Sequence, residues 1–221
     1  VDCGVLFPGD DQPGIDLILP DFSYLKDRMN DIEAIFLTHG HEDHIGAVPY
    51  LLRERSDIRI IGSQLTLAFV APKLKERRIT APMTQVKAGQ VEKVGPFTLE
   101  FVTVNHSIPD SLAVAIKTPA GVILHTGDFK MDKMPLDGKV TDLETFARLG
   151  KEGVDLFLVD STNADVPGLT VAEKDIYPAL KEAIDKTPRR VVVTSFASHV
   201  HRIQQVLDAA NESNRKVAYV G

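Results

Sequence analysis

The sequence has a single cysteine and no long apolar run. Cys3, as the lone cysteine, excludes an internal disulfide and any Cys-rich zinc module, and its apolar neighbours favour a small buried residue over a nucleophile. No stretch of eighteen apolar residues exists, and the first residues lack the basic start of a signal peptide. These absences predict a cytoplasmic protein without a membrane partner.

Two catalytic signatures are also missing. The sequence contains no Gly-x-Ser-x-Gly motif and no Gly-rich phosphate-binding loop. The formal charge of −6 over 221 residues argues against a surface that binds nucleic acid everywhere, because phosphate contacts come from clustered Lys and Arg, but it allows a local basic channel. With 43% hydrophobic residues the chain can bury a core.

The densest group of possible metal ligands lies in the segment His39–His44. The apolar run Ile32–Leu37 before it predicts a buried strand, and the apolar spacing in Ile45–Leu52 after it predicts a helix. Imidazole and carboxylate together suit zinc or a similar divalent ion, and open positions for water are typical of a catalytic site. A polar loop whose histidines only cap a helix is the alternative, but such crowding would be costly without a cation. The candidate ligands are His39, His41, Asp43 and His44.

Two later residues complete a possible dinuclear site. His106 follows the strand-like run Phe97–Val104, and Asp128 follows Val122–Leu124. Each alone is an ordinary loop residue, but together with the His39–His44 segment they supply a third imidazole and a carboxylate that can bridge two ions. Two cations can hold a water, lower its pKa and neutralise charge on a phosphoryl or acyl oxygen, so hydrolysis is the expected reaction. Asp2 could either stabilise the fold or accept the outer N–H of a metal-bound imidazole.

The order of the elements predicts an α/β protein. A β-α-β-α start is followed by an antiparallel meander and then by further helices and strands. A break at Lys186–Arg190 marks the start of a second α/β unit, and the chain is expected to be a fragment because it begins without Met inside a strand and stops inside another. The expected strands are 1–7, 32–37, 58–61, 91–94, 97–104, 112–117, 122–124, 155–159, 190–195 and 217–220, and the expected helices are 24–29, 45–52, 64–75, 142–149, 171–186 and 200–210.

The pattern His-x-His-x-Asp-His after a strand, followed by a strand-end His and a Gly-Asp, resembles the metallo-β-lactamase superfamily, whose fold is an αβ/βα sandwich. Longer strings are similar to the ribonuclease J family of bacterial β-CASP nucleases, and the likeness runs across nearly the whole chain. The strings that carry it are Leu37–Gly46, Asn105–Ser111, His125–Lys130 and Asp160–Ala164.

The resemblance implies a role for each residue. Residues 1–188 would form an incomplete metallo-β-lactamase domain, and residues 189–221 the beginning of a β-CASP domain. Of two zinc ions, one would be held by His39, His41 and His106 and the other by Asp43 and His44, with Asp128 between them. Asp43 would also serve as the catalytic carboxylate, Asp2 and Asp160 would support the ligands, and Ser198 and His201 would contact a substrate phosphate. One more histidine of the second site is expected beyond Gly221, so that site is incomplete in this chain.

The implied activity is metal-dependent hydrolysis of RNA phosphodiesters, in a 5′-to-3′ exonucleolytic and an endonucleolytic mode, for mRNA decay and rRNA maturation. RNA is the expected partner, and the full-length protein is expected to be a homo-dimer or homo-tetramer. The alternative is a small-molecule hydrolase of the same fold acting on a lactone, thioester or β-lactam. The new α/β unit that begins at about Arg190 favours the nuclease, since small-molecule members finish soon after Asp160. An RNA-binding subunit without catalytic activity would be expected to lack at least one metal ligand, yet all six expected metal ligands are present in this sequence.

Overall fold

The computed structural model describes residues 1–168 and 171–220 and contains two β-sheets that pack face to face. The first sheet is parallel, with strand order β1-β2-β3, and the second has the order β4-β5-β6-β7-β8. Strands β4 to β7 form the expected antiparallel meander, and β8 adds to β7 in parallel. The strands are β1 Ala34–Leu37, β2 Arg59–Gly62, β3 Met83–Gln85, β4 Val91–Val94, β5 Phe97–Thr103, β6 Leu112–Thr118, β7 Gly121–His125 and β8 Leu156–Leu158.

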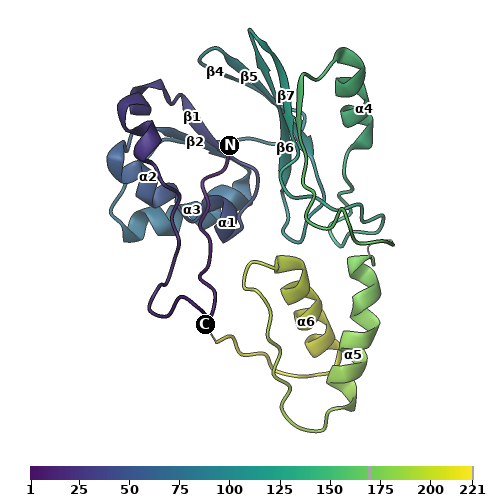
Figure 1. Ribbon diagram of the computed structural model, residues 1–221. Helices are drawn as coiled ribbons and strands as arrows, with labels where there is room; N and C mark the ends of the chain where they lie inside the picture. The colour runs from purple at the N-terminus through teal and green to yellow at the C-terminus, as the bar shows by residue number, and fades with distance from the viewer. Residues whose placement is uncertain (169–170, 221) are drawn as a thin grey trace.

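Helices cover the outer faces of both sheets, which gives the layer order helix, sheet, sheet, helix seen in Figure 1. The first sheet carries the 3₁₀ segment Ser23–Asp31 and the helices α1 Glu42–Ile45, α2 Val48–Glu54 and α3 Gln64–Glu76. The second sheet carries α4 Leu143–Glu152. This is the αβ/βα sandwich that the sequence predicted.

Three apolar clusters lie between these layers. One packs the first helices on β1 and β2 of the first sheet, and another packs α4 on the second sheet. Between the sheets, Phe36 of β1 meets Phe101 of β5 with ring centroids 5.1 Å apart. Both rings are at least 95% buried, so the two sheets share a continuous core.

The helix starts follow local capping rules. The Ser63 side chain accepts a hydrogen bond from the Thr66 amide at 3.4 Å, so α3 begins where the sequence placed it. Asp142 caps α4 in the same way, accepting from the Thr145 amide at 3.0 Å. Both caps hold helices that cover a sheet.

The last part of the chain lies below the sandwich in Figure 1. A 3₁₀ turn over Glu173–Ile176 leads into α5 Tyr177–Lys186, and α6 Val200–Glu212 packs beside α5. None of the helices within 1–168 and 171–220 is long and apolar enough to cross a membrane.

Three of the expected strands are wrong. Residues 1–7 form no strand: Asp2 has φ 56°, only Leu6 forms a bridge, to Ile18, and the amides of Asp2 and Cys3 donate to the carbonyls of Phe36 and His44. Residues 190–195 and 217–220 form no ladder with any described strand. An apolar extended segment becomes a strand only where a second backbone is placed to pair with it. The strand β3 was missed because it is three residues long and two of these residues are polar.

Candidate metal centre

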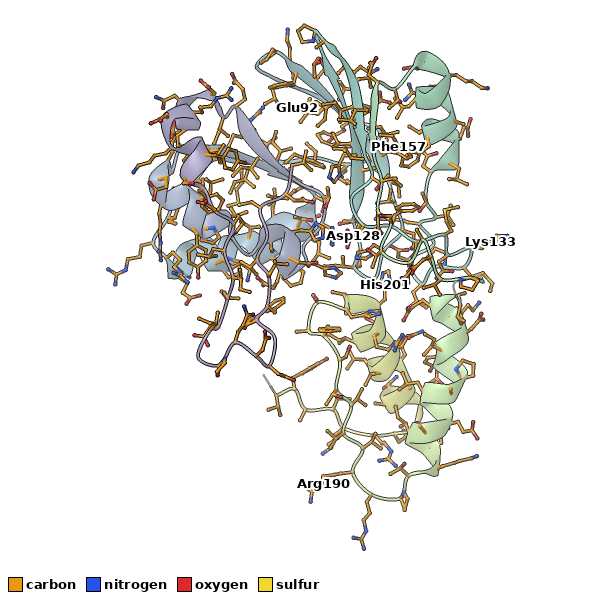
Figure 2. The ribbon with its side chains drawn as sticks, in the orientation of Figure 1. Glu92, Asp128, Lys133, Phe157, Arg190 and His201 are labelled. Atoms are coloured by element: carbon orange, nitrogen blue, oxygen red, sulfur yellow. The ribbon has the colours of Figure 1, made fainter. Side chains whose placement is uncertain are left out.

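The candidate ligands gather where strands of both sheets end. His39 lies two residues after β1, His106 three residues after β5, and Asp128 three residues after β7. The Leu112 amide donates to the Thr38 carbonyl at 2.9 Å, which ties the β1 end to the second sheet. Figure 2 shows Asp128 at this junction, between the sandwich and the last helices.

Three imidazoles converge on one point. The His41 Nδ1 atom lies 3.0 Å from His39 Nε2 and 3.2 Å from His106 Nε2. Zinc–nitrogen bonds of about 2.0–2.1 Å at tetrahedral angles separate ligand nitrogens by about 3.4 Å. The spacing of the imidazoles is therefore close to that of a zinc site with three His ligands.

Asp128 faces both halves of the cluster. Its Oδ2 atom lies 3.7 Å from His106 Nε2 and 4.0 Å from His39 Nε2, while its Oδ1 atom lies 3.4 Å from His44 Nε2. One carboxylate thus presents an oxygen to each of two possible ion positions. His39, His44 and Asp128 form a second group of ligand atoms within 4.8 Å of one another.

Asp43 lies at the edge of the cluster. Its Oδ2 atom is 3.6 Å from His44 Nε2, and about half of its side chain is exposed. It belongs to neither group of mutually close ligand atoms. The position leaves this carboxylate open to water and to a substrate.

Asp2 organises the ligands from behind. Its Oδ1 atom accepts from the Thr38 amide at 2.8 Å, and its Oδ2 atom accepts from His44 Nδ1 at 2.8 Å and from the Thr38 hydroxyl at 2.9 Å. Because the Thr38 hydroxyl donates to Asp2, it accepts from His39 Nδ1 at 2.9 Å. These bonds place the Nδ1 protons of His39 and His44 on the outer side of the rings and leave both Nε2 atoms for the site.

Two close approaches require glycine here. A Cβ on Gly4 would lie 1.5 Å from the Asp43 carbonyl oxygen, so no side chain fits between Asp2 and the ligand loop. Gly127 has φ +59° and approaches the Thr38 side chain, which brings the β7 end onto the β1 end. The backbone of Asp2 itself has φ 56°, an uncommon conformation that Asp tolerates better than most residues.

The charges of the cluster suit a cation. Burial, together with the neighbouring imidazoles, lowers the pKa of His39 and lowers that of His106 to about 4, so both rings are neutral ligands at neutral pH. The hydrogen bond from His44 lowers the pKa of Asp128, which stays a carboxylate. Burial lowers the pKa of His44, but its hydrogen bonds to Asp128 and Asp2 outweigh burial and raise the pKa to about 10. A positive charge is thus favoured between His44 and Asp128.

The other expected residues lie around this cluster. Asp160 Oδ2 accepts from the Phe129 amide at 3.3 Å, next to Asp128, so Asp160 supports the β7 loop. Burial lowers the pKa of His41, and a contact with the Ser198 backbone is among the groups that oppose this, so the Ser198 backbone approaches the His41 ring. His201 is 5% exposed, and its Nε2 atom lies 3.8 Å from Asp137 Oδ2. Its ring faces the protein rather than the ligand cluster.

Sequence reasoning missed two supporting residues. Thr38 precedes the first histidine and bonds both Asp2 and His39, a role for which its position directly before the ligand loop was the available signal. Glu173 accepts a hydrogen bond from Lys130, which lies two residues after Asp128 and 43 residues before Glu173 in the sequence. No local sequence pattern predicts a contact between residues so far apart in the sequence.

Comparison with protein-family models decides the fold family. Residues 8–145 match the model described as the metallo-β-lactamase superfamily. The chain belongs to this superfamily. Residues 188–221 also match a model described as the β-CASP domain of ribonuclease J.

Known relatives of this superfamily member are similar over the whole chain. A ribonuclease J of Mycobacterium tuberculosis is 54% identical over 221 residues, covering 100% of this chain and 40% of that protein. A ribonuclease J of Corynebacterium glutamicum is 53% identical and one of Thermus thermophilus 45%, covering 31% and 40% of those proteins. The chain therefore spans less than half the length of these relatives. A crystal structure of an Enterococcus faecalis protein of unknown function matches with TM-score 0.64 at 20% identity, over 94% of this chain and 56% of that one, which supports the fold.

Asp2→Asn should weaken metal binding by roughly 10 to 100-fold, because the amide has one acceptor oxygen in place of two and no charge, so if that oxygen keeps the His44 N–H and the Thr38 hydroxyl, its NH2 group faces the Thr38 amide, another donor. Competition with a chelator of known affinity measures this. Asp10→Asn, in the exposed loop after the first extended segment, is the matched control. Metal affinity equal to wild type with a lower melting temperature would assign Asp2 to the fold alone.

Proposed function

We propose that this chain is the catalytic part of a zinc-dependent ribonuclease that hydrolyses RNA phosphodiesters, in 5′-to-3′ exonucleolytic and endonucleolytic modes. The observation that carries the proposal is the convergence of three imidazoles and Asp128 in a chain 54% identical to a ribonuclease J. The single cysteine and an RNA substrate favour the cytoplasm. Dimers or tetramers of the full-length protein belong to the same proposal.

His39, His41 and His106 would hold one zinc ion, Asp43 and His44 the other, and Asp128 would lie between them. A further imidazole from outside residues 1–221 would complete the second site. Bound zinc supplies Lewis acidity, which makes hydroxide available near neutral pH and neutralises charge on a phosphoryl oxygen.

The protein's own groups then do three things in the reaction. Asp2 and Thr38 hold the outer nitrogens of His44 and His39, so these rings keep one orientation throughout. Asp128 keeps its negative charge between the two ligand groups. Asp43, half exposed beside His44, is placed to accept a proton from the attacking water.

The last part of the chain would bind the RNA. In the proposed division, residues 1–188 form the metallo-β-lactamase domain and residues 189–221 begin a β-CASP domain. Ser198, beside His41, is placed to contact a phosphate of the RNA. His201 would act from its buried position at the start of α6, where it helps to hold that helix turn rather than reach into solvent.

The test is cleavage of 5′-monophosphate and 5′-triphosphate RNAs by the full-length protein, with and without chelator. We expect cleavage that chelator stops and added zinc restores. Products of one nucleotide would mark the exonucleolytic mode, and internal fragments the endonucleolytic one. A protein that leaves both RNAs intact but hydrolyses a lactone, thioester or β-lactam would support the small-molecule alternative instead.

A further inference from the structure

Glu173 is a buried carboxylate at the junction between the sandwich and α6. It is 5% exposed, yet three cationic nitrogens surround its side chain. Oε1 accepts from Arg202 Nη2 at 2.8 Å and from Arg202 Nε at 3.1 Å, while Oε2 accepts from Lys130 Nζ at 3.3 Å. A charge this deeply buried persists only where such partners compensate it.

The Glu173 backbone binds the same two parts of the protein. Its N–H donates to Asp132 Oδ2 at 2.9 Å, and its carbonyl accepts from Gln205 Nε2 at 2.7 Å. Asp132 lies in the loop that follows β7, and Gln205 lies on α6; both are at least 97% buried. Side chain and backbone of Glu173 therefore both join the β7 loop to α6.

On the sandwich side, this loop carries a candidate ligand. Lys130 is two residues from Asp128, and its amide donates at 2.8 Å to the carbonyl of Asn105, the residue before His106. The Lys130 carbonyl also accepts from the Thr141 hydroxyl at 3.1 Å. Because these backbone bonds do not involve Glu173, the loop keeps its place when the Glu173 charge is removed.

On the other side, Glu173 reaches the first turn of α6. His199 caps this helix, with its Nδ1 accepting from the Arg202 amide at 3.2 Å, and its Nε2 lies 3.9 Å from Glu173 Oε1. Ser198 precedes the cap and lies beside His41. Figure 2 shows His201, also in this turn, close below Asp128. The helix start thus meets the metal centre where Glu173 fastens it.

We propose that Glu173 is a positioning residue, which fixes the first turn of α6 against the β7 loop and so holds Ser198 where an RNA phosphate passes the metal centre. The inference rests on the proposed ribonuclease function. Glu173 itself touches no ligand atom of the cluster, so its effect is confined to substrates that extend from the metals to α6.

The test compares a long and a short substrate on the full-length protein. For Glu173→Gln we expect cleavage of 5′-monophosphate RNA to fall by about 100-fold, as misplacement of a binding group by about 1 Å can do. Hydrolysis of bis(p-nitrophenyl) phosphate, which carries no neighbouring phosphate for Ser198 to hold, should stay close to wild type, and so should the metal content. Glu182→Gln is the matched control, because Glu182 is exposed and, among residues 1–168 and 171–220, forms its ion pair with Lys186 on the same helix.

Arg202→Gln and the double variant separate positioning from general stability. Arg202→Gln should show the same RNA-selective loss, and the double variant should be no worse than Glu173→Gln, because both changes remove the same Glu173–Arg202 contact. Additive losses would overturn the proposal. Equal loss on both substrates, accompanied by loss of metal, would show that Glu173 supports the metal loop instead.

Amide hydrogen exchange keeps the test independent of RNA cleavage. In Glu173→Gln we expect faster exchange over residues 199–203 and unchanged exchange over residues 104–106. Unchanged exchange in both segments, or full RNA cleavage by the variant, would overturn the proposal. A wild-type protein that cleaves no RNA would instead reject the proposed function, and the exchange result would still decide whether Glu173 fixes α6.

Discussion

Replacing His41 by Ala should lower RNA cleavage by the full-length protein at least about 1,000-fold, in the range that loss of a single catalytic group costs other hydrolases. The reason is geometric: His41 Nδ1 is the atom that both His39 and His106 approach, at 3.0 and 3.2 Å. Folding should change little, because the side chain lies in a loop and not in the core. Cleavage rates and thermal melting measure the two effects.

Glu42→Gln is the matched control for this variant. Glu42 follows His41 directly, but its side chain pairs with Lys73 of α3 and does not face the ligand cluster. Its change should leave cleavage near wild type. If His41→Ala cleaved RNA at the wild-type rate, the assignment of this loop to the metal centre would be wrong.

Asp128→Asn should lower activity by about 100-fold, comparable to the loss of a charge-stabilising group in other active sites, while one metal ion remains bound. The amide keeps the shape of the side chain but loses the negative charge that faces His44 on one side and His106 on the other. The three-imidazole group does not need that charge to hold its ion. Elemental analysis after dialysis, together with kinetics, separates occupancy from rate.

The comparison for Asp128 is Asp132→Asn, since Asp132 lies in the same loop but binds the amides of Met134 and Glu173 rather than the ligands. That variant should keep its metal content. Full activity of Asp128→Asn with two ions per chain would show that Asp128 does not lie between the ions.

Local patterns predicted much of the fold. The ladder from β4 to β7 and the cap at Ser63 followed from alternation, turn residues and one hydroxyl side chain, all of which act within a few residues. The segments 190–195 and 217–220 have similarly apolar sequences, but the prediction of strands there was wrong. A strand also needs a neighbouring backbone to pair with, and the sequence of the segment itself does not provide one.

The same distinction holds for the candidate site. The His39–His44 segment is visible in the sequence because four candidate ligands lie within six residues. That His106 and Asp128 come close to it depends on two sheets meeting; their residue types and strand-end positions suggested the grouping, and the resemblance to a family gave each of them a role. The bonds from Asp2 to Thr38 and from Glu173 to Lys130 span 36 and 43 residues and have no local signature.

The origin of the ligands has a consequence for stability. His39, His41 and His44 belong to the first sheet's edge, whereas His106 and Asp128 belong to the second, so a bound ion ties the two sheets together like a cross-link. An ion that binds only the folded chain raises the free energy of unfolding by about 2.7 kcal/mol when its free concentration is a hundred times its dissociation constant. The melting temperature should therefore rise with the concentration of free zinc. Chelation should weaken the contacts between the two sheets before it affects the pairing of strands within either sheet.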